Sequence, residues 1–590
     1  MPKILINQWE AEVPEGATIL DAARAVGVEI PTLCHLEGKP PIGACRICVV
    51  EVEGARTLVA SCSTPVTEGM KVRTNSQRVR EARRTVAELL LSEHEGSCQY
   101  CSRSDDCELK KIASHLGIKT IRYEGEKPER HFDDSTPALV RDSAKCIKCR
   151  RCVTVCREVQ GVGALFPQNR GYKTVIGPAF GLDLDSVACV QCGQCAAICP
   201  VGAIQEKNSI DQVWEVLEDK TKHVVVQTAP AIRAALGECF DYPPGTLVTG
   251  KMVTALRRLG FAAVFDTNFT ADLTILEEGS ELLMRLKKAL VTHEPTALPM
   301  FTSCSPGWIK FAEYYYPQYL NNLSTCKSPQ QMFGAVAKTY YASKKGLRPE
   351  DVIVVSVMPC TAKKFEAQRP EMNSSGVQDV DYVLTTRELG FMIHSAGIDF
   401  ASLEDGEMDS PLGVSTGAAD IFANTGGVME AALRTVYEIV TGREFPTADL
   451  RLRPIEGLEG LKEASLTVTG TLPDWNFLEN VELKIAVAHG LANAAKLLDS
   501  VEAGKSHYHF VEVMTCPGGC IGGGGQPRYT DDSVRLKRID AIYKEDAGKK
   551  LRKSHMNPQV KTLYDEFLKQ PLGEKSHHLL HTHYHKRPKT

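Results

Sequence analysis

Two cysteines and a run of glycines, in the stretch EVMTCPGGCIGGGGQP between Glu512 and Pro527, have the types and spacing for metal chemistry. Cys516 and Cys520 stand four residues apart, a spacing at which two thiolates can bind one soft metal centre. The glycines at 522–525 carry no side chains, so the backbone can approach a bulky group closely. We therefore predict an inorganic centre here. The alternative is a flexible glycine-rich loop beside two unrelated buried thiols.

The other cysteines strengthen the prediction of metal binding. The chain has 590 residues and 21 cysteines, of which 15 lie before residue 200 and many are separated by only two residues. Disulfide frameworks are typical of short secreted chains, whereas this chain is long and its first residues lack the apolar region of a signal peptide. Groups of thiols at short gaps are therefore interpreted as metal sites.

The first group of cysteines follows the pattern C-x10-C-x2-C-x13-C. Four thiolates at this kind of spacing suit a 2Fe2S cluster, because a loop can supply two or three ligands and a later strand the last. Zinc is the alternative. The predicted ligands of the 2Fe2S cluster are Cys34, Cys45, Cys48 and Cys62.

The second group combines one histidine with three cysteines in the pattern H-x3-C-x2-C-x5-C. On ligand chemistry alone, this set fits zinc as well as a 4Fe4S cluster. Its position between two groups with iron-sulfur spacing favours the 4Fe4S cluster. The predicted ligands are His94, Cys98, Cys101 and Cys107.

The third group is the strongest local signal, because the run C-x2-C-x2-C-x3-C occurs twice, from Cys146 and from Cys189. In two-cluster ferredoxins the fourth cysteine of each run binds the other cluster. Two neighbouring clusters favour electron conduction over a purely structural role. The predicted ligands are Cys146, Cys149, Cys152 and Cys199 for the first 4Fe4S cluster, and Cys189, Cys192, Cys195 and Cys156 for the second.

The elements that must position these groups divide the chain into four regions and a tail. Residues 1–78 show two short strands followed by an amphipathic helix, and residues 79–140 place a helical stretch before the histidine and three cysteines. Residues 141–209 hold the duplicated runs. Residues 210–530 alternate apolar strands with helices, one of them near 231–239, which indicates an α/β domain. The predicted fold class is an α/β catalytic domain preceded by small α+β iron-sulfur domains.

A polar, mostly helical tail is predicted for residues 531–590. Five of its histidines lie between His577 and His585 without a defined ligand spacing. We interpret them as part of a docked or frayed terminal segment and not as a metal site.

Composition and missing motifs exclude several classes of function. The formal net charge of -4 shows no basic excess of the kind that binds a nucleic-acid backbone. No window approaches the roughly 18 consecutive apolar residues of a membrane span, so a cytoplasmic protein is expected. The α/β region carries neither a GxGxxG nor a Walker A pattern, so no nucleotide site is expected in this chain.

Three segments of the α/β region, taken in order, resemble the signature segments of the catalytic domain of iron-iron hydrogenases. They are TSCSPGW from Thr302, MPCTAKKFE from Met358 and EVMTCPGGCIGGGG from Glu512. The cysteine groups upstream are similar to the accessory domains of that family's long forms. Those domains are a plant-ferredoxin-like 2Fe2S domain, a helical histidine-cysteine 4Fe4S domain and a bacterial two-4Fe4S ferredoxin-like domain. The resemblance covers essentially the whole chain.

The resemblance implies an H-cluster, in which a 4Fe4S cube is joined through one cysteine sulfur to a two-iron subsite carrying carbon monoxide, cyanide and a dithiolate bridge. By position, Cys360 and Cys516 are expected to bind the cube and Cys520 to bridge cube and subsite. Lys363 is expected to donate to a cyanide. The glycine run is expected to leave room for the metal pair. The further residues expected beside the cofactor are Met358, Met514, Pro230, Ala231, Gly522 and Gly523.

The first segment departs from the family's pattern, which usually has two adjacent cysteines before the proline. Here the pair is Cys304 and Ser305. Direct register places Cys304 at the position that relays protons to the dithiolate and Ser305 at the position that binds the cube. Three options stay open: Ser305 binds iron through oxygen, Cys304 binds iron and the relay is altered, or the fourth iron takes another ligand.

The resemblance also implies a proton channel. The segment LEEGSELLMR supplies Glu278, Glu281 and Arg285, and NLSTCKSPQQ supplies Ser324. Hydroxyl and carboxylate groups can pass a proton along hydrogen bonds when each lies within reach of the next. Taken singly, the two glutamates would be interpreted as a solvated helix face. In the context of the family, they are predicted to carry protons.

The predicted function is reversible interconversion of hydrogen with protons and electrons at an H-cluster, with one 2Fe2S and three accessory 4Fe4S clusters relaying electrons. The amino-terminal region is similar to that of respiratory complex I, yet the chain lacks a nucleotide site. We therefore expect flavin- and NAD(P)-binding partner subunits, further iron-sulfur subunits, an electron-bifurcating form of such a complex, and maturation proteins. The alternatives are a stand-alone ferredoxin-dependent hydrogenase and a hydrogenase-like electron-transfer or cluster-assembly protein without the two-iron subsite.

Overall fold

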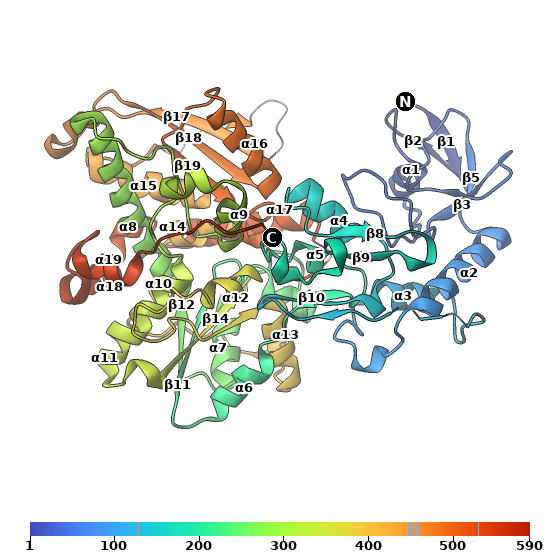
Figure 1. Ribbon diagram of the computed structural model, residues 1–590, viewed down its shortest axis with the longest axis horizontal. Coiled ribbons are helices and arrows are strands. Elements are labelled where there is room, and N and C mark those ends of the chain that lie inside the picture. The colour runs from blue at the N-terminus through green and yellow to red at the C-terminus, as the bar shows by residue number, and fades with distance from the viewer. Residues whose placement is uncertain (125, 128, 447–452, 455–459, 529, 590) are drawn as a thin grey trace.

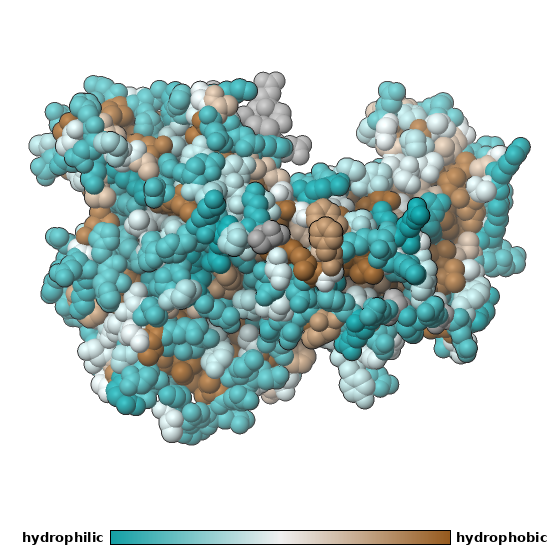
Figure 2. All heavy atoms as spheres, in the orientation of Figure 1, coloured by the Kyte–Doolittle hydropathy of each residue, from teal (hydrophilic) through white to brown (hydrophobic). Residues whose placement is uncertain are grey.

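The computed structural model describes residues 1–124, 126–127, 129–446, 453–454, 460–528 and 530–589. An amino-terminal sheet lies at one end of the molecule and the two sheets of the catalytic region at the other, with residues 141–209 between them (Figure 1). Hydrophilic side chains cover most of the face shown in Figure 2, and hydrophobic ones lie in scattered groups. None of the helices that the structure describes combines the length and the apolar character needed to cross a membrane.

The amino-terminal region folds as a five-stranded sheet in the order β2-β1-β5-β3-β4, with one helix packed on it. Helix α1 (Ile19–Ala25) begins at Thr18, whose hydroxyl accepts from the Asp21 amide while the Asp21 carboxylate accepts from the Thr18 amide. The two strands and the helix predicted here are confirmed. The strands are β1 (Lys3–Ile6), β2 (Trp9–Glu12), β3 (Val49–Val52), β4 (Val59–Ala60) and β5 (Lys71–Arg73).

Two helices follow the amino-terminal sheet. Helix α2 (Gln77–Glu93) begins at Ser76, whose hydroxyl accepts from the amide of Val79 at 3.3 Å. It packs against β3 and against α3 (Glu108–His115). His94 follows the last residue of α2, so the helix end places this side chain.

The duplication within residues 141–209 is visible in the backbone. Short helices α4 (Arg151–Thr154) and α5 (Gln194–Ala197) begin after equivalent cysteines of the two runs. The residue before each helix, Arg150 or Gly193, has a left-handed φ of 65° or 72°. The strands of this region and of the segment just before it are β6 (Phe132–Asp133), β7 (Leu139–Asp142), β8 (Phe166–Gln168), β9 (Val175–Gly177) and β10 (Ile204–Glu206).

Two sheets form the framework of the catalytic region. The first has the order β12-β11-β14-β15 and is parallel throughout, and its buried strands are the apolar runs expected of such a sheet. Its strands are β11 (His223–Thr228), β12 (Ala263–Asp266), β14 (Val352–Met358) and β15 (Tyr382–Thr385).

The second sheet has the order β13-β19-β18-β17-β16. Strands β13, β19 and β18 run parallel, and the pairs beyond β18 are antiparallel. The parallel part therefore brings the carboxyl ends of three strands to one edge. The strands are β13 (Met300–Phe301), β16 (Arg453–Pro454), β17 (Leu461–Thr467), β18 (Glu482–His489) and β19 (Phe510–Met514).

Helix α8 (Thr267–Lys287) spans 21 residues and is buried along most of its surface. It packs against α10 (Pro329–Val336) and α15 (Gly427–Thr441). A helix buried on all sides can place acidic side chains in the interior, where each needs a hydrogen-bond partner. The other helices of the catalytic region are α6 (Ile210–Glu218), α7 (Thr249–Arg258), α9 (Pro306–Tyr315), α11 (Ala342–Lys345), α12 (Ala362–Ala367), α13 (Thr386–Ser395), α14 (Gly417–Asp420) and α16 (Leu491–Glu502).

The prediction of an α-helix near residues 231–239 is wrong. The structure has turns there, followed by a 3₁₀ helix at Leu236–Phe240. The fully buried Arg233 ties this segment to Asp266 and Asp420 at 2.8 Å each, and the Ala231 carbonyl accepts from Gln526. These contacts with distant segments hold the turns in place.

The tail docks on the catalytic region. Helix α17 (Asp532–Gly548) packs against α14, while α18 (Pro558–Leu563) and α19 (Glu574–Leu580) pack against α8 and α10 respectively. After α19 the chain pairs with residues 325–327 through two backbone hydrogen bonds of 2.7 and 2.8 Å. Of the two interpretations of the terminal segment, the docked one therefore holds for the described residues.

Candidate active site and electron relay

The cysteines of the first group lie together and are buried, with exposed fractions of at most 6%. The sulfurs of Cys48 and Cys62 are 3.4 Å apart, and the amide nitrogen of Cys45 lies 3.5 Å from the sulfur of Cys34. Hydrogen bonding from Cys45 lowers the pKa of Cys34, and hydrogen bonding from Cys62 lowers that of Cys48. Four buried sulfurs in mutual contact, two of them readily ionised, suit a thiolate-ligated metal centre.

His94 fits a metal ligand because its buried Nδ1 atom has no hydrogen-bond partner among the described residues. Burial lowers the pKa of His94, which favours the neutral ring that a metal ligand requires. Burial also raises the pKa of Cys107, and the charge of Cys101 raises it further, so these two lie near each other. Cys98 is half-buried on the same short turn as Cys101.

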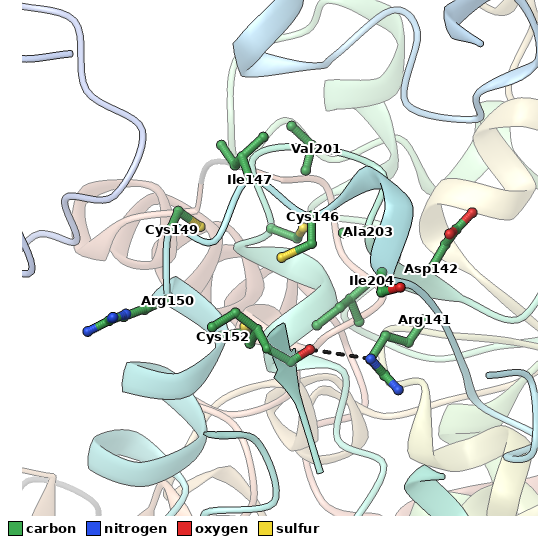
Figure 3. A pocket seen from close by; sticks show the side chains of 13 residues that line it. Arg141, Asp142, Cys146, Ile147, Cys149, Arg150, Cys152, Val201, Ala203 and Ile204 are labelled. Carbon is green, nitrogen blue, oxygen red and sulfur yellow. Dashed lines mark hydrogen bonds between the residues drawn. The ribbon is translucent and has the colours of Figure 1, made fainter. Parts of the chain in front are cut away.

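Two pockets between the duplicated runs are each lined by four cysteines. The first pocket, shown in Figure 3, is lined by Cys146, Cys149, Cys152 and Cys199. The second is lined by Cys156, Cys189, Cys192 and Cys195. Each pocket thus takes three cysteines from one run and the last cysteine of the other, the arrangement of two-cluster ferredoxins. Burial raises the pKa of Cys146 and Cys156 to about 11, so bound metal would have to displace their protons.

The accessory sites are adjacent to one another. Arg151 pairs with Glu108 of α3 at 2.6 Å, and the charges of both Cys149 and Cys45 act on its guanidinium. The first group of cysteines and the pocket of Figure 3 therefore lie near the same side chain. On the histidine-cysteine side, Arg103 donates to the carbonyl of Cys199 at 2.7 Å.

The second pocket abuts the catalytic region. The charge of Cys192 acts on Cys516, so these sulfurs lie near each other across the boundary. An added Cβ at Gly524 would come 2.3 Å from the Cys192 carbonyl oxygen, and one at Gly193 would come 2.3 Å from the Thr361 hydroxyl. Only glycine allows the two regions to approach this closely at both positions.

The three signature segments meet because each follows the carboxyl end of a strand. Cys304 follows β13, Cys360 follows β14 and Cys516 follows β19, so strands of both sheets direct their following loops to one place. Ligand sites in α/β folds form at such strand ends.

Cys360, Cys516 and Cys520 form one group, in which Cys360 and Cys516 are buried and Cys520 is half-buried. The charge of Cys360 acts on both Cys516 and Cys520, and burial raises the pKa of Cys520 to about 12. Three thiols in an interior site are costly as anions unless a metal neutralises them. The donor set therefore fits a soft metal centre.

Backbone contacts also require glycine in the run at 522–525. An added Cβ at Gly522 would lie 2.1 Å from the Pro517 carbonyl oxygen, and one at Gly523 would lie 2.2 Å from the Pro359 carbonyl oxygen. Protein backbone, present without any cofactor, already requires glycine at these two positions.

Lys363 lies beside this group of cysteines. Its Nζ atom donates to the carbonyl of Cys304 at 3.1 Å and to the carboxylate of Glu366 at 2.9 Å. Glu366 also accepts from the Ser328 hydroxyl at 2.8 Å. The charge of Lys363 acts on Cys304 and Cys520, where it opposes the rise in pKa caused by burial.

Cys304 and Ser305 have different neighbours. Burial raises the pKa of Cys304 well above its usual value, and the charges of Glu278 and Cys520 raise it further. The hydroxyl of Ser305 lies 2.7 Å from the Thr515 hydroxyl, next to Cys516 in the chain. Ser305 has an extended backbone, in which successive side chains point to opposite sides. The structure therefore groups Cys304 with Glu278 and Ser305 with Thr515.

The four residues of the predicted proton channel form a connected series, in which each contacts the next. Burial raises the pKa of Glu278 to about 8, and its hydrogen bond with Ser324 opposes that rise. The Ser324 hydroxyl donates to Glu281 at 3.2 Å, and Arg285 donates to Glu281 at 2.6 Å. All four are buried, so the interpretation of a solvated helix face is wrong for both glutamates.

The remaining predicted residues are buried around the signature loops. Met358 and Met514 end β14 and β19, and each is 2% exposed. Pro230 and Ala231 lie in the turn after β11, and both are buried. The Ala231 carbonyl accepts from Gln526 at 3.2 Å, which ties this turn to the glycine-rich loop.

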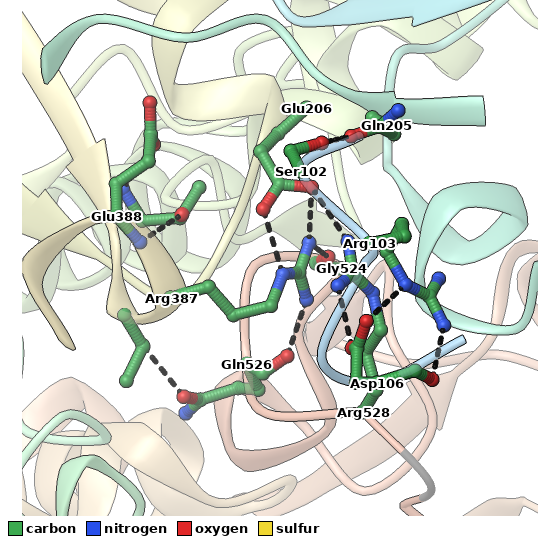
Figure 4. Close-up of polar contacts among 12 residues, drawn as sticks. Ser102, Arg103, Asp106, Gln205, Glu206, Arg387, Glu388, Gly524, Gln526 and Arg528 are labelled. Atoms are coloured by element: carbon green, nitrogen blue, oxygen red, sulfur yellow. Dashed lines mark hydrogen bonds and ion pairs between the residues drawn. The ribbon is translucent and has the colours of Figure 1, made fainter. Parts of the chain in front are cut away.

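Sequence reasoning missed an ion network that joins three regions of the chain (Figure 4). Glu206 of β10 accepts two bonds from Arg387 of α13, at 2.7 and 2.8 Å, and one from Arg528 at 3.3 Å. Arg528 also donates to Asp106 at 2.8 Å, and Arg387 donates to the Gly524 carbonyl at 2.9 Å. The partners are far apart in sequence, so no local pattern could have indicated them.

Sequence reasoning also missed the role of Glu512. This carboxylate accepts from the amides of Gly426 and Met429, at 2.6 and 2.8 Å, at the start of α15. Burial raises the pKa of Glu512 to about 7, and its charge acts on Cys304 and Cys520. An acidic residue within the apolar strand FVEVM was the signal available.

Comparison with known families shows to which family the chain belongs. The family described as "Iron only hydrogenase large subunit, C-terminal domain" matches residues 222–524, more than half of the chain. The chain belongs to the iron-only hydrogenase family. It is an oxidoreductase that acts on hydrogen. Further matches are "Iron hydrogenase small subunit" at residues 532–587, "2Fe-2S iron-sulfur cluster binding domain" at 3–77, "NADH-ubiquinone oxidoreductase-G iron-sulfur binding region" at 83–122 and "4Fe-4S dicluster domain" at 145–203.

Relatives of this hydrogenase extend over its full length. It is 52% identical to "NADP-reducing hydrogenase subunit HndD" of Solidesulfovibrio fructosivorans, over 100% of this chain and 99% of the relative. It is 42% identical to "Iron hydrogenase 1" of Clostridium pasteurianum, over 99% and 100% of the two chains. A solved structure of a variant of apo [FeFe]-hydrogenase HydA1 from Chlamydomonas reinhardtii matches with a TM-score of 0.59 and 44% identity, over 65% of this chain and 100% of that one. The predicted family, fold class and hydrogenase activity are confirmed.

Proposed function

We propose that this chain is the hydrogen-converting subunit of a larger enzyme that exchanges electrons with NADP or NAD through flavin-binding partner subunits. The observation that carries the proposal is the meeting of Cys360, Cys516 and Cys520 beside Lys363, next to the pocket that contains Cys192. The name of the full-length relative, an NADP-reducing hydrogenase subunit, supports the electron partner. Electron bifurcation fits the same architecture.

The metal centre proposed for this site is an H-cluster. Cys360 and Cys516 would bind its cube, and Cys520 would bridge the cube to the two-iron subsite. When bound, this cofactor supplies the metal at which hydrogen is split or formed. Lys363 would donate a charged hydrogen bond to a cyanide, because two of its partners are already fixed in the protein and an ammonium has three donors.

For the first signature segment we favour direct register. Cys304 would carry protons, since Glu278, Cys520 and Lys363 all act on it. Ser305 would hold the fourth corner of the cube through oxygen, since its hydroxyl meets Thr515 beside Cys516. Oxygen is a harder donor than sulfur, so this corner would be bound less tightly than the other three.

The residues of α8 would move protons between the site and the surface. In hydrogen evolution a proton would pass from Glu281 through the Ser324 hydroxyl to Glu278, and from there to Cys304. The 3.2 Å contact between Ser324 and Glu281 and the contact of Ser324 with Glu278 support this order. Hydrogen oxidation would use the same groups in reverse.

Electrons would enter or leave through four accessory clusters. The pocket containing Cys192 would hold the cluster nearest the H-cluster, and the pocket of Figure 3 the next one. The first group of cysteines and the histidine-cysteine group would both lie beside the cluster in the pocket of Figure 3. The contacts of Arg151 and Cys199 support this placement. Partner subunits would dock near either of these outer sites.

Infrared spectroscopy of the purified native enzyme tests the proposal. Carbon monoxide and cyanide bound to iron absorb where protein does not, and we expect both sets of bands. A fully matured sample without them would overturn the H-cluster and favour a hydrogenase-like electron-transfer or cluster-assembly protein. Purification should also recover flavin-containing subunits, and their absence would favour a stand-alone hydrogenase that uses ferredoxin.

A further inference from the structure

His581, one of the tail histidines set aside in the sequence, is buried against the proposed proton channel. Its side chain is 4% exposed, and residues 580–582 pair with the segment that follows Ser324. Tyr584 secures this contact, because its hydroxyl donates to the Ser324 carbonyl at 3.1 Å. The tail therefore brings an imidazole beside residues of α8 that lie some 300 positions earlier in the chain.

Both ring nitrogens of His581 have partners that belong to a continuous hydrogen-bonded chain. The Nδ1 atom lies 2.8 Å from the Thr325 hydroxyl, and that hydroxyl lies 3.1 Å from Oε2 of Glu281. The Nε2 atom lies 3.2 Å from Oε2 of Glu277, which is fully buried. Glu281 accepts from Ser324 through the same Oε2 atom, so this chain joins the proposed proton channel at Glu281.

The outer end of the chain reaches a solvent-exposed imidazole. The ring centroid of His577 lies 4.4 Å from that of His581, one helical turn earlier in α19. His577 is exposed, whereas His581 is buried. The pair therefore spans the boundary between solvent and the interior.

We propose that His577 and His581 form a second proton entrance, which reaches Glu281 through Thr325. This inference deepens the proton channel of the proposed function and rests on it. The entrance is separate from the end of the channel at Arg285. Arg285 holds Glu281 at 2.6 Å and also donates to the carbonyls of Ala297 and Leu323, so its side chain is fixed in place.

The proton transfer balances at each atom. In hydrogen evolution a proton from solvent, delivered by His577 through one water molecule, adds to Nε2 of neutral His581. The proton on Nδ1 then leaves to Thr325, and the hydroxyl proton of Thr325 passes to Oε2 of Glu281. The ring is again neutral with its proton on Nε2, and proton exchange with water, in which one proton leaves Nε2 and another adds to Nδ1, restores the starting tautomer.

The groups around His581 favour this relay. Glu277 and Glu281 are the carboxylates facing the ring, and their negative charges stabilise the imidazolium that forms transiently. Tyr564 donates to Glu277 at 2.6 Å, and burial raises its pKa well above the usual value, so it stays neutral. Burial raises the pKa of Cys326 in the same way, so the thiol beside the ring adds no charge.

The same residues could instead bind a divalent metal. Glu281, Cys326 and His581 each offer one ligand atom, and these atoms lie within 4.8 Å of one another. However, both ring nitrogens already take part in hydrogen bonds, and a relay uses those bonds as they stand. The metal content of the purified protein separates the two possibilities.

The test compares hydrogen evolution by His581→Gln and His578→Gln in the complete enzyme, with reduced viologen as electron donor. His578 is exposed on the same helix and serves as the matched control. A glutamine amide in place of the His581 ring keeps hydrogen bonds but cannot take up and release a proton. We therefore expect turnover to fall roughly tenfold. This loss is smaller than the ~10²-fold loss typical of a sole proton carrier, because the first entrance still operates. Added imidazole should restore turnover of His581→Ala.

Three outcomes would overturn the second entrance. They are equal turnover of the His581→Gln and His578→Gln variants, a deficit of His581→Ala that added imidazole does not relieve, and one equivalent of zinc that is lost in His581→Gln. Glu278→Gln tests the shared channel separately: full turnover in that variant would overturn the channel of the proposed function and the entrance with it. Unchanged infrared bands in every variant show that a loss of turnover comes from proton transfer and not from loss of the cofactor.

Discussion

The ammonium of Lys363 donates to the carbonyl oxygen of Cys304 at 3.1 Å and thereby joins loops that follow strands of different sheets. The bond involves the backbone of Cys304, so the thiol itself takes no part in it. Replacing the side chain of Cys304 should therefore leave its loop in place. The separate roles of Cys304 and Ser305 can be tested on that basis.

Cys304→Ala should lose hydrogen turnover by about 10²-fold or more while the iron content of the cube stays unchanged. Ser305→Ala should instead change the electron paramagnetic resonance of the cube or lower its iron content, because it removes the proposed oxygen ligand. Ser305→Cys provides the matched control and should bind the cube at least as well as the natural residue. Unchanged iron and spectra in both alanine variants would show that neither residue binds the cluster.

Gly524→Ala should weaken the junction between the ferredoxin-like region and the catalytic region. The added methyl group would meet the Cys192 carbonyl oxygen at 2.3 Å and the Gly193 carbonyl carbon at 2.7 Å, and backbone cannot move aside cheaply. Such overpacking costs about 1–3 kcal/mol, so the thermal unfolding midpoint should fall. Gly548→Ala is the control, since its added Cβ meets nothing within 4 Å. Equal midpoints for the two variants would contradict this account of the junction.

Glu206→Gln should destabilise the ion network of Figure 4. The charges of Arg387 and Arg528 favour the ionised form, so the pKa of Glu206 lies below its usual range despite burial. Neutralising this carboxylate leaves two buried guanidinium groups undercompensated, a change that costs about 3–5 kcal/mol in comparable cases. The contribution of the ion pairs is present above about pH 4 and is lost as pH falls through the lowered pKa.

Limited proteolysis at neutral pH can measure that effect. In the Glu206→Gln variant, cleavage between the amino-terminal regions and the catalytic region should become faster. Glu574→Gln, at an exposed position in α19, should behave like the unmodified chain. A Glu206 variant that resists protease as well as this control would show that the network contributes little.

Asp272→Asn should remove a pH dependence of stability. Burial raises the pKa of Asp272 to about 7, although Thr416 and Asn557 donate hydrogen bonds to it. Between about pH 4 and 7 the carboxyl ionises in the unfolded chain but not in the folded one, so rising pH favours unfolding by at most roughly 1.4 kcal/mol per pH unit. The asparagine variant lacks this contribution.

Thermal midpoints measured from pH 4.5 to pH 7, between the unfolded and folded pKa values of Asp272, can check this prediction. The midpoint of the natural chain should fall relative to that of Asp272→Asn as pH rises. Asp540→Asn, exposed on α17, should follow the natural chain throughout. Parallel curves for Asp272→Asn and the natural chain would mean that this carboxyl ionises normally.

The sequence predicted those features that depend on local spacing. The cysteine runs from Cys146 and Cys189 indicated two adjacent pockets, and apolar periodicity located β1, β2 and α1. Both follow from short-range geometry that repeats between proteins. The family resemblance added the three catalytic loops, which spacing alone could not have joined.

Contacts between distant segments were beyond the reach of sequence. The bond between Thr325 and His581 joins residues 256 positions apart, and that between Arg528 and Asp106 joins residues 422 apart. The glycines illustrate the same limit, because Gly522 and Gly523 lie against the carbonyls of Pro517 and Pro359, contacts that the sequence did not indicate. The turns at residues 231–239 likewise follow from Arg233 and its distant partners.

The close contact between Gly193 and Thr361, and between Gly524 and Cys192, also limits how such enzymes can be recombined. Iron-sulfur modules look interchangeable when they are compared by their cysteine patterns. A two-cluster module from another protein would fit this catalytic region only if it also had glycine at the position of Gly193. One methyl group at that position, and not the ligands of any cluster, would decide which chimaeras can assemble.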